Sequence, residues 1–581
     1  MKRMRIVQRE PVRTAGNFDA SLPPLLQRLY LQRGITEQSQ LQTDLAGLPS
    51  PDRFKGMADA VQLLVQALQQ QQRICIVGDF DADGATSTAL AVHALRAMGA
   101  RADFLVPNRF EYGYGLTPEI VEVVLAQQSP DLIITVDNGI SSWEGVTLAK
   151  QHGVRVLVTD HHLPGQTLPD ADAIVNPNQP GCDFPSKNIA GVGVIFYVMS
   201  AVRKTLREQG YFSARGIAEP NLAEYLDLVA LGTVADVVAL DFYNRILVQQ
   251  GLLRIRAGRA RPGLQALMEM TKRTPSRLVA DDLGFALAPR LNAAGRMDDM
   301  STGIRCLLST RLDQARSLAA ALDELNRERK SVEQGMQEEA RAAVDGLHLQ
   351  EGGLPWGLCV MDDNWHQGVV GLLASRLKER YHRPVIAFAP ADAHTLKGSA
   401  RSIEGLHMRD AIEAVSTRHP GLVQRFGGHA MAAGLSLSRQ HFIEFAAAFD
   451  HYVRQQLDEA DLHAVLLTDG ELAAADFQLE LARALRQGGP WGQRFPAPLF
   501  HGHFRVRQQR LMGEQHMRLQ LELLDDNKPA TAVEAVAFFV EARLREQLRP
   551  GVLCRMAYRL DVNEYRGEET LQLVAEYLEL A

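Results

Sequence analysis

The stretch Ile74-Cys75-Ile76-Val77-Gly78-Asp79-Phe80-Asp81-Ala82-Asp83-Gly84 joins a short apolar run to three closely spaced carboxylates. A short apolar run that ends at glycine or polar residues is typical of a buried parallel strand. Ligands of an open parallel α/β sheet lie just beyond the carboxyl ends of its strands. The stretch therefore predicts a strand that carries Asp79, Asp81 and Asp83 to a ligand-binding edge of a sheet.

Three further apolar runs end in the same way. Residues 132–136 stop at Asp137, and residues 154–159 stop at Asp160-His161-His162. Residues 226–234 end shortly before Asp236. We interpret all four runs as parallel strands with adjacent carboxyl ends. Taken singly, Asp137 or Asp236 could equally cap a helix or lie in a turn, so the prediction depends on the repeated context.

The residue types at these ends suit divalent metal ions. Alternating carboxylates repel one another, and a hard cation removes that penalty while using their oxygens as ligands. Asp-x-Asp-Gly is also common in solvated turns, so Asp79 to Asp83 alone favour neither alternative. Adjacent imidazoles can point differently, one toward metal and one toward substrate. Mostly oxygen ligands with one imidazole favour Mn²⁺ or Mg²⁺ over zinc.

Composition narrows the class of protein. The 581 residues carry a net charge of −7, which neither favours nor excludes a nucleic-acid partner when a carboxylate-rich site lies beside basic patches. The five cysteines are far apart and form no zinc spacing or disulfide framework, which predicts a reduced, cytoplasmic protein. No stretch is long and apolar enough to cross a bilayer, and no signal-peptide core follows the basic start.

Periodicity predicts several domains. The region from 51 to 270 alternates helix and strand, including a helix over residues 86–98 that begins at a Thr/Ser cap. A long helix is expected from Leu312 to Val344, and five short strands near the end suit a small barrel of the OB type, a common binder of single strands. We predict the following segments: a lead-in over 1–50, an α/β domain with a parallel sheet over 51–270, a helical connector over 271–350, a smaller α/β domain over 351–457 and an OB-like β-barrel over 458–581.

The four strand-end motifs resemble a known family. Asp-Phe-Asp-Ala-Asp-Gly, Val-Asp-Asn-Gly, Thr-Asp-His-His and Gly-Thr-Val-Ala-Asp-Val are similar to the four signature motifs of the DHH phosphoesterase superfamily. Residues 106–116, Arg290-Leu291-Asn292-Ala293-Ala294-Gly295-Arg296 and Phe426-Gly427-Gly428-His429 narrow the resemblance to its bacterial single-strand-specific exonucleases. The resemblance implies that residues 51–270 form the DHH domain and residues 351–457 the DHH-associated domain.

Carried over by motif, the resemblance implies a site for two Mn²⁺ or Mg²⁺ ions. Asp81 and Asp83 would bind different ions, Asp137 would bridge them, and His161 with Asp236 would complete the second. His162 would face the scissile phosphate. Superfamily members often carry a histidine at the position of Val77, so Asp79 or water would replace that ligand here. The implied catalytic and metal-binding residues are thus Asp79, Asp81, Asp83, Asp137, His161, His162 and Asp236.

A second set of residues is implied for the 5′ phosphate of the substrate. Glycines let the backbone approach a phosphate closely, and arginine or histidine can donate to its oxygens. The implied set consists of Arg109, Ser399, Arg401, Gly427, Gly428 and His429, which we place in loops. Without the resemblance, tight turns with exposed side chains would be the better interpretation of these segments.

The resemblance implies a 5′→3′ exonuclease that is specific for single-stranded DNA and acts in DNA repair and recombination. It also implies a single-stranded-DNA-binding protein and a repair helicase as partners. Two alternatives stay open: a DHH hydrolase of oligoribonucleotides or cyclic dinucleotides, and a non-catalytic replication scaffold of the same fold.

Overall fold

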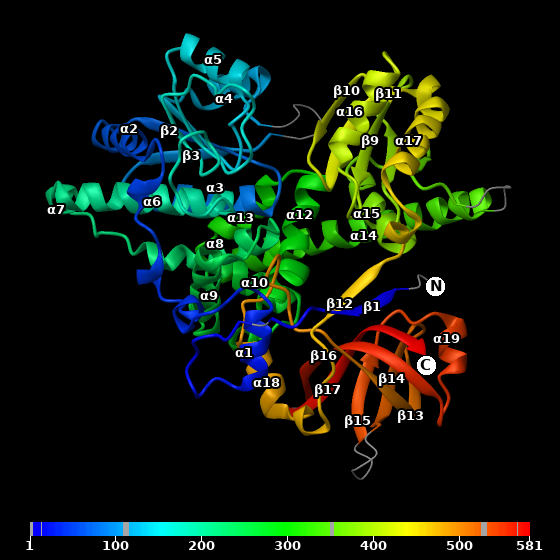
Figure 1. Ribbon diagram of the computed structural model, residues 1–581. Helices are drawn as coiled ribbons and strands as arrows, with labels where there is room; N and C mark the ends of the chain where they lie inside the picture. The colour runs from blue at the N-terminus through cyan, green and yellow to red at the C-terminus, as the bar shows by residue number, and fades with distance from the viewer. Residues whose placement is uncertain (1–3, 13, 108–114, 349–353, 525–531, 566) are drawn as a thin grey trace. The chain divides into compact units, whose positions relative to one another are not determined.

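The computed structural model describes residues 4–12, 14–107, 115–348, 354–524, 532–565 and 567–581, which form two compact units. The first, here called the parallel-sheet unit, consists of Glu10–Asn326 and Ala482–Pro498. The second, here called the barrel unit, consists of Met1–Arg9, Arg327–Leu481 and Leu499–Ala581. Figure 1 labels the helices and strands of both.

The parallel-sheet unit is built on five parallel strands in the order β3-β2-β4-β5-β6. Their bounds are β2 Arg73–Gly78, β3 Arg101–Leu105, β4 Leu132–Val136, β5 Arg155–Thr159 and β6 Ala173–Val175. The strands predicted before Asp79, Asp137 and Asp160 are therefore confirmed. Because β2, β4 and β5 are covered on both faces, their sequences are almost continuously apolar rather than alternating.

Helices cover both faces of this sheet (Figure 1). Alternate strand residues such as Val77, Ile133 and Val156 pack against α4 (Pro118–Gln128) and α5 (Trp143–Gln151). The opposite face is covered by α3 (Ala82–Ala97) and α6 (Gly191–Glu208), with α2 (Met57–Gln69) beside α6. The sheet is thus a central layer with its carboxyl edge open to the loops that follow each strand.

One predicted strand is wrong: residues 226–234 form a helix, α8 (Leu226–Ala235), which is buried on nearly every side. A helix buried all round is apolar all round, so periodicity cannot separate it from a buried strand. Its one interior charge, Asp227, pairs with Arg261 at 2.8 Å between Oδ1 and Nη2. Asp236 therefore reaches the site from the end of a helix.

The predicted start of α3 is also wrong. The helix begins at Ala82, within the acidic motif itself, and Asp81 is its N-cap. Thr86 and Ser87, the expected caps, lie buried inside the helix. Aspartate caps a helix as well as serine or threonine does, so the motif could be interpreted either as the end of a strand or as the start of a helix.

The rest of the unit is helical up to the long helix α14 (Leu312–His348), which agrees with the prediction for this region. Besides short 3-10 helices, the described part of the chain before α14 also contains α1 Pro24–Leu31, α7 Tyr211–Arg215, α9 Phe242–Arg256, α10 Pro262–Met270, α11 Ala280–Asp282, a π-helix Leu283–Leu287, α12 Ala288–Met297 and α13 Ser301–Leu308. Residues 482–498 also belong here, since Tyr30 Oη donates to the Gly488 carbonyl at 2.9 Å and Leu240 N to that of Gln493 at 2.8 Å. None of the helices in the described part of the chain is long and apolar enough to cross a membrane.

The barrel unit contains a mixed sheet in the order β10-β11-β9-β8-β7. A core around Phe388, Phe445 and Phe449 joins this sheet to its helices. The bounds are β7 Leu358–Met361, α15 Val370–Tyr381, β8 Val385–Pro390, β9 Thr395–Arg401, α16 Met408–Arg418, β10 Arg425–Gly428, β11 Ala432–Ser438 and α17 Phe442–Gln456. These elements make the second, smaller α/β domain that was expected.

A closed five-stranded barrel, β13-β14-β15-β17-β16, completes the unit. Its elements are β13 Phe500–Met512, β14 His516–Leu523, β15 Ala532–Ala537, α19 Ala542–Gln547, β16 Leu553–Tyr565 and β17 Glu568–Leu580. Before it, β12 (Val465–Thr468) pairs in parallel with β1 (Arg5–Gln8), and α18 spans Leu479–Gln487. The OB-like barrel is confirmed, whereas the exact segment limits at 50, 270, 350 and 457 stay predictions.

Candidate metal centre

The carboxyl ends of four neighbouring strands, β2, β4, β5 and β6, lie level at one edge of the parallel sheet. Gly78 is in register with Val136, Val136 with Thr159, and Thr159 with Val175. The next residue after each of the first three strands is therefore Asp79, Asp137 or Asp160, and all three are buried. The alignment of parallel strands thus brings together residues that are widely separated in the sequence.

The loop after β2 folds tightly back into α3. Asp81 Oδ1 accepts hydrogen bonds from the amides of Asp83, at 2.9 Å, and Gly84, at 3.0 Å. A Cβ at residue 84 would lie 2.6 Å from the Asp79 carbonyl oxygen, so this position requires glycine. Asp79 Oδ1 accepts from the Phe80 amide at 2.7 Å. Backbone contacts thus orient the carboxylates of both Asp79 and Asp81.

Asp83 is buried against the start of α6. Its Oδ2 accepts from Gly191 N at 2.6 Å and its Oδ1 from Val192 N at 3.0 Å, both in the first turn of α6. Burial, followed by the charge of Asp81, raises the pKa of Asp83 to about 7. The positive end of the α6 dipole opposes this shift by stabilising the carboxylate.

Asp137 lies at the centre of the cluster, with a left-handed φ of 63°. Its amide donates to the Thr159 carbonyl at 3.0 Å, which ties the end of β4 to the end of β5. A Cβ on Gly191 would lie 2.6 Å from Asp137 Oδ1, so glycine lets α6 approach the carboxylate. Burial and the neighbouring charge of Asp83 hold the pKa of Asp137 well above its usual range.

The three residues Asp160-His161-His162 have separate positions and contacts. Asp160 Oδ1 accepts from the amides of His161, at 2.7 Å, and His162, at 3.1 Å, and lies 2.8 Å from His162 Nδ1. Burial alone would lower the pKa of His162, but the hydrogen bond to Asp160 raises it to about 9. Asp160 therefore orients His162 and keeps it cationic, a role that the sequence analysis missed although the acid beside two histidines could have signalled it.

His161 points to the other side of the cluster. Its Nε2 lies 3.0 Å from Asp137 Oδ1 and 3.5 Å from Asp236 Oδ2. Burial, together with the charge of His162, lowers the pKa of His161 to about 4, so the ring is neutral at pH 7 and can act as a ligand. Asp236, at the C-terminal end of α8, has a pKa raised well above its usual range by burial and then by Asp83.

All seven residues predicted for metal or catalysis lie together. Ligand atoms within 4.8 Å of one another form three groups: Asp83, His161 and Asp236; Asp79, Asp81 and Asp137; and Asp137, His161 and His162. Several buried carboxylates that raise each other's pKa are costly unless a cation balances them. An oxygen-rich set with one neutral imidazole suits Mn²⁺ or Mg²⁺, so the residues present fit two such ions.

Val77, which stands where superfamily members often have a histidine, is buried in the strand core and cannot bind a metal through its side chain. The Asp79 carboxylate groups with those of Asp81 and Asp137. This arrangement favours Asp79 over water as the replacement ligand, which stays a prediction.

The residues predicted for the 5′ phosphate lie in the barrel unit, apart from Arg109, which is outside the described residues. Their predicted loops are wrong: Ser399 and Arg401 lie on β9, and Gly427 and Gly428 on β10. Backbone pairing through Gly434 places Ser399 and Gly427 in one row across the sheet. Glycine-rich segments are typical of turns, but they also form strands where close packing requires small residues.

Arg401 and Ser399 form a polar pair on this sheet. Arg401 Nη1 donates to Ser399 Oγ at 3.2 Å and to the Ala400 carbonyl at 2.8 Å. A Cβ on Gly371, in the first turn of α15, would lie 3.0 Å from Ser399 Oγ. Burial lowers the pKa of Arg401, and no carboxylate among the described residues pairs with it. A guanidinium without a paired carboxylate, next to a hydroxyl, glycines and the start of a helix, suits the binding of an anionic group. His429 is exposed at the end of β10.

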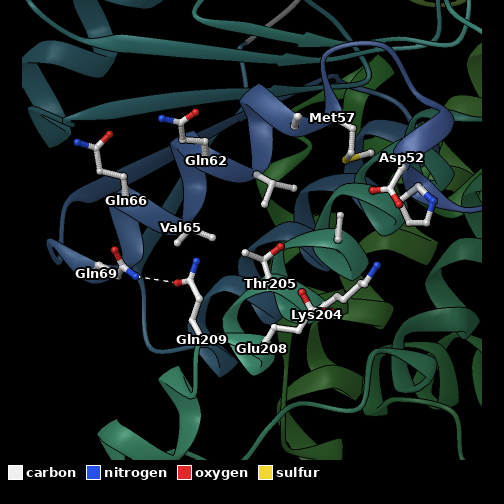
Figure 2. A pocket seen from close by; sticks show the side chains of 14 residues that line it. Asp52, Met57, Gln62, Val65, Gln66, Gln69, Lys204, Thr205, Glu208 and Gln209 are labelled. Carbon is white, nitrogen blue, oxygen red and sulfur yellow. Dashed lines mark hydrogen bonds between the residues drawn. The ribbon is translucent and has the colours of Figure 1, made fainter.

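A pocket elsewhere in the parallel-sheet unit is separate from the metal centre. Figure 2 shows it between α2 and α6, with a volume of about 640 Å³ and a hydrogen bond of 2.9 Å between Gln69 and Gln209 at one end. Its lining is a mixture of apolar side chains such as Val65 and polar ones such as Gln62 and Lys204. None of the clustered acids or histidines lines it, so it is not part of the candidate site.

Comparison with family models agrees with the arrangement of domains. Residues 73–233 match the DHH family, N-terminal domain; residues 355–455 match the DHHA1 domain; and residues 468–577 match the RecJ OB domain. The three matches cover the parallel sheet, the second α/β domain and the barrel.

Relatives and solved structures match over the whole chain. The single-stranded-DNA-specific exonuclease RecJ of Dickeya dadantii is 56% identical over 559 residues, covering 96% of both chains. That of Escherichia coli is 53% identical over 578 residues, covering 99% of both. The crystal structure of Thermus thermophilus RecJ in complex with Mn²⁺ has a TM-score of 0.80 and 30% identity, and covers 100% of this chain and 80% of that one. The chain therefore belongs to the RecJ family of single-stranded-DNA-specific exonucleases.

Proposed function

We propose that this protein is a metal-dependent exonuclease that hydrolyses single-stranded DNA stepwise from its 5′ end, using two Mn²⁺ or Mg²⁺ ions. The observation that carries the proposal is the convergence of five carboxylates and two imidazoles at the carboxyl edge of the parallel sheet. Its relatives bear the name of single-stranded-DNA-specific exonucleases, and the acids of all four motifs are present in this chain.

The distances between their ligand atoms divide the candidate metal ligands between two ions. Asp79, Asp81 and Asp137 would hold one, while Asp83, His161 and Asp236 would hold the other, with Asp137 close enough to His161 to serve both. Bound ions of this kind activate water and neutralise charge on a phosphate. His162, kept cationic by Asp160, can donate a hydrogen bond to a phosphate oxygen as negative charge develops there.

In this proposal, the mixed sheet of the barrel unit recognises the 5′ end of the DNA strand. Arg401 and Ser399 on β9 would bind the terminal phosphate with Gly427, Gly428 and His429, which lie on β10 and at its end, one strand further across the sheet. Arg109 stays a further candidate from the sequence. A phosphomonoester carries more charge than an internal diester, so a guanidinium beside glycine backbone favours the end of a strand over its interior.

The OB-like barrel would bind single-stranded DNA. Phe538 and Phe539, directly after β15, are 52% and 76% exposed, and their rings lie 5.3 Å and 4.8 Å from that of His516. His516 begins β14, next to the β13–β14 turn, and the surface around strands 2 and 3 of an OB fold binds oligonucleotides. Exposed rings at this place can stack on bases without regard to sequence.

We assign the protein to DNA repair and recombination in the bacterial cytoplasm, with a single-stranded-DNA-binding protein and a repair helicase as partners. These assignments rest on membership of the family and on no particular residue of the chain.

Asp137→Asn should reduce nuclease activity by about 10³-fold or more, because it removes the carboxylate nearest both groups of ligands. The assay is Mn²⁺-dependent digestion of single strands labelled at either end, with blunt duplex and RNA as controls. The parent protein should release the 5′ label first and spare the duplex. Asp59→Asn makes the same change on the exposed side of α2 and should leave the rate unchanged. Full activity of Asp137→Asn, or equal release of both labels by the parent, would contradict the proposal.

Arg401→Ala should raise KM for a 5′-phosphorylated strand by about 10- to 100-fold, since it removes a charge-assisted hydrogen bond, and should leave kcat at saturation nearly unchanged. KM for a 5′-hydroxyl strand should change little. Arg418→Ala, on α16 of the same unit, is the matched control. An equal effect of Arg401→Ala on both strands would argue against recognition of the terminal phosphate.

Replacing both Phe538 and Phe539 with alanine should weaken binding of a long single strand by about 10-fold or more, because each stacked base contributes about 1–3 kcal/mol. Turnover of an oligonucleotide too short to reach the barrel should stay the same. Ile443→Ala removes an equally exposed apolar side chain from α17 and serves as control. Affinity is measured by fluorescence anisotropy in the presence of Ca²⁺; undiminished affinity for the long strand would overturn the assignment.

A further inference from the structure

The loop from Asp79 to Asp83 carries three of the proposed metal ligands and needs support from outside itself. The first amides of a helix have no acceptor within the helix. In α3, Asp83 N and Gly84 N donate to Asp81 Oδ1, but Ala82 N donates to Asn292 Oδ1 at 2.8 Å. Asn292 lies 210 positions further along the chain, in α12. The first amides of α3 are therefore capped by two side chains, those of Asp81, a candidate metal ligand, and of Asn292, far away in the sequence.

A second contact lies one helical turn further along α12. A Cβ built on Gly295 would overlap the carbonyl oxygen of Phe80, so the helix backbone lies directly against the backbone of the loop. Residues three apart lie on the same face of a helix. Asn292 and Gly295 therefore contact the loop at two points, on either side of Asp81.

The helix that makes these contacts is itself anchored. Arg290 donates from Nε to Asp323 Oδ1 at 2.9 Å and approaches the same oxygen with Nη2 at 2.7 Å, and Asp323 lies on α14. The two side chains are only 15% and 7% exposed, so breaking the pair would leave a buried charge without its partner. Leu291, Ala293 and Ala294 are buried as well. All of these residues belong to the parallel-sheet unit.

We propose that Asn292 and Gly295 form a clamp that fixes the acidic loop, and that Asn292 is a positioning residue for the metal ligands. Asp81 Oδ1 already accepts two amides, which leaves Oδ2 for an ion. If Asn292 did not accept the Ala82 amide, the Asp81 carboxylate would be drawn to a third backbone donor and away from the ion. The clamp rests on the proposed two-ion function and concerns how that site keeps its geometry.

The test is direct titration of Mn²⁺ into metal-free protein, followed by the electron paramagnetic resonance signal of free Mn²⁺, with no DNA present. Asn292→Ala should weaken Mn²⁺ binding by about 10- to 100-fold, the usual effect of losing a group that orients metal ligands. Asn292→Asp, which keeps an oxygen acceptor, should bind Mn²⁺ with most of the affinity of the parent protein. Gly295→Ala should weaken binding too, because its Cβ displaces the Phe80 carbonyl.

The matched control is Asn221→Ala, which removes a side-chain oxygen that accepts the Ala223 amide at 3.2 Å at another helix start of the same unit. It should leave Mn²⁺ affinity unchanged. Thermal unfolding of each metal-free variant checks folding, and Asn292→Ser, whose hydroxyl is too short to reach the amide, replaces Asn292→Ala if that variant does not fold. Parent-like affinity in folded variants lacking the acceptor overturns the clamp. Failure of the parent itself to bind Mn²⁺ would instead overturn the proposed function.

Discussion

Electrostatic repulsion among buried carboxylates is the constraint on which the rest of the parallel-sheet unit depends. Burial raises the pKa of Asp83, Asp137 and Asp236, and the charges of neighbouring carboxylates raise each of them further. A folded protein tolerates such a cluster when cations balance it, so the same feature is a cost to the empty fold and the source of metal affinity. The arrangement therefore makes sense as a binding site and not as a source of stability.

The fold meets that constraint with backbone rather than with other side-chain charges. Register places Asp79, Asp137 and Asp160 at one edge, while the start of α6 gives two amides to Asp83. Gly84 and Gly191 allow the backbone to approach the acids more closely than a Cβ would permit. Within this cluster of described residues, His162 is the side chain whose pKa is raised, to about 9, by its hydrogen bond to Asp160, and contact with a phosphate is its proposed role.

Much of this could be predicted from sequence, because the signals are local. Continuous apolar runs identified β2, β4 and β5, and the acids after β2 and β4 identified part of the cluster of candidate ligands. The helix at residues 226–234 was misread since complete burial removes the periodicity that separates helix from strand. Asn292 had no local signal as a cap of α3, because that contact spans 210 positions. The structure shows that the predicted metal ligands lie together, while the role of each predicted site residue stays a prediction.

The long helix α14 joins two differently specialised units. Its first half is tied to the parallel-sheet unit by Asp323, and its second half to the barrel unit by Glu333 and Glu339, which bind Arg376 and Trp365. The division between the units falls between Asn326 and Arg327, inside this helix. In the proposed function, hydrolysis is assigned to the parallel-sheet unit and DNA binding to the barrel unit.

Anomalous X-ray scattering from crystals grown with Mn²⁺ tests the central claim most directly. The account predicts two Mn²⁺ ions at the carboxyl edge of the parallel sheet, one touching Asp79, Asp81 and Asp137 and the other touching Asp83, His161 and Asp236. A single ion without contact to Asp137, or Mn²⁺ bound only elsewhere on the protein, would contradict it.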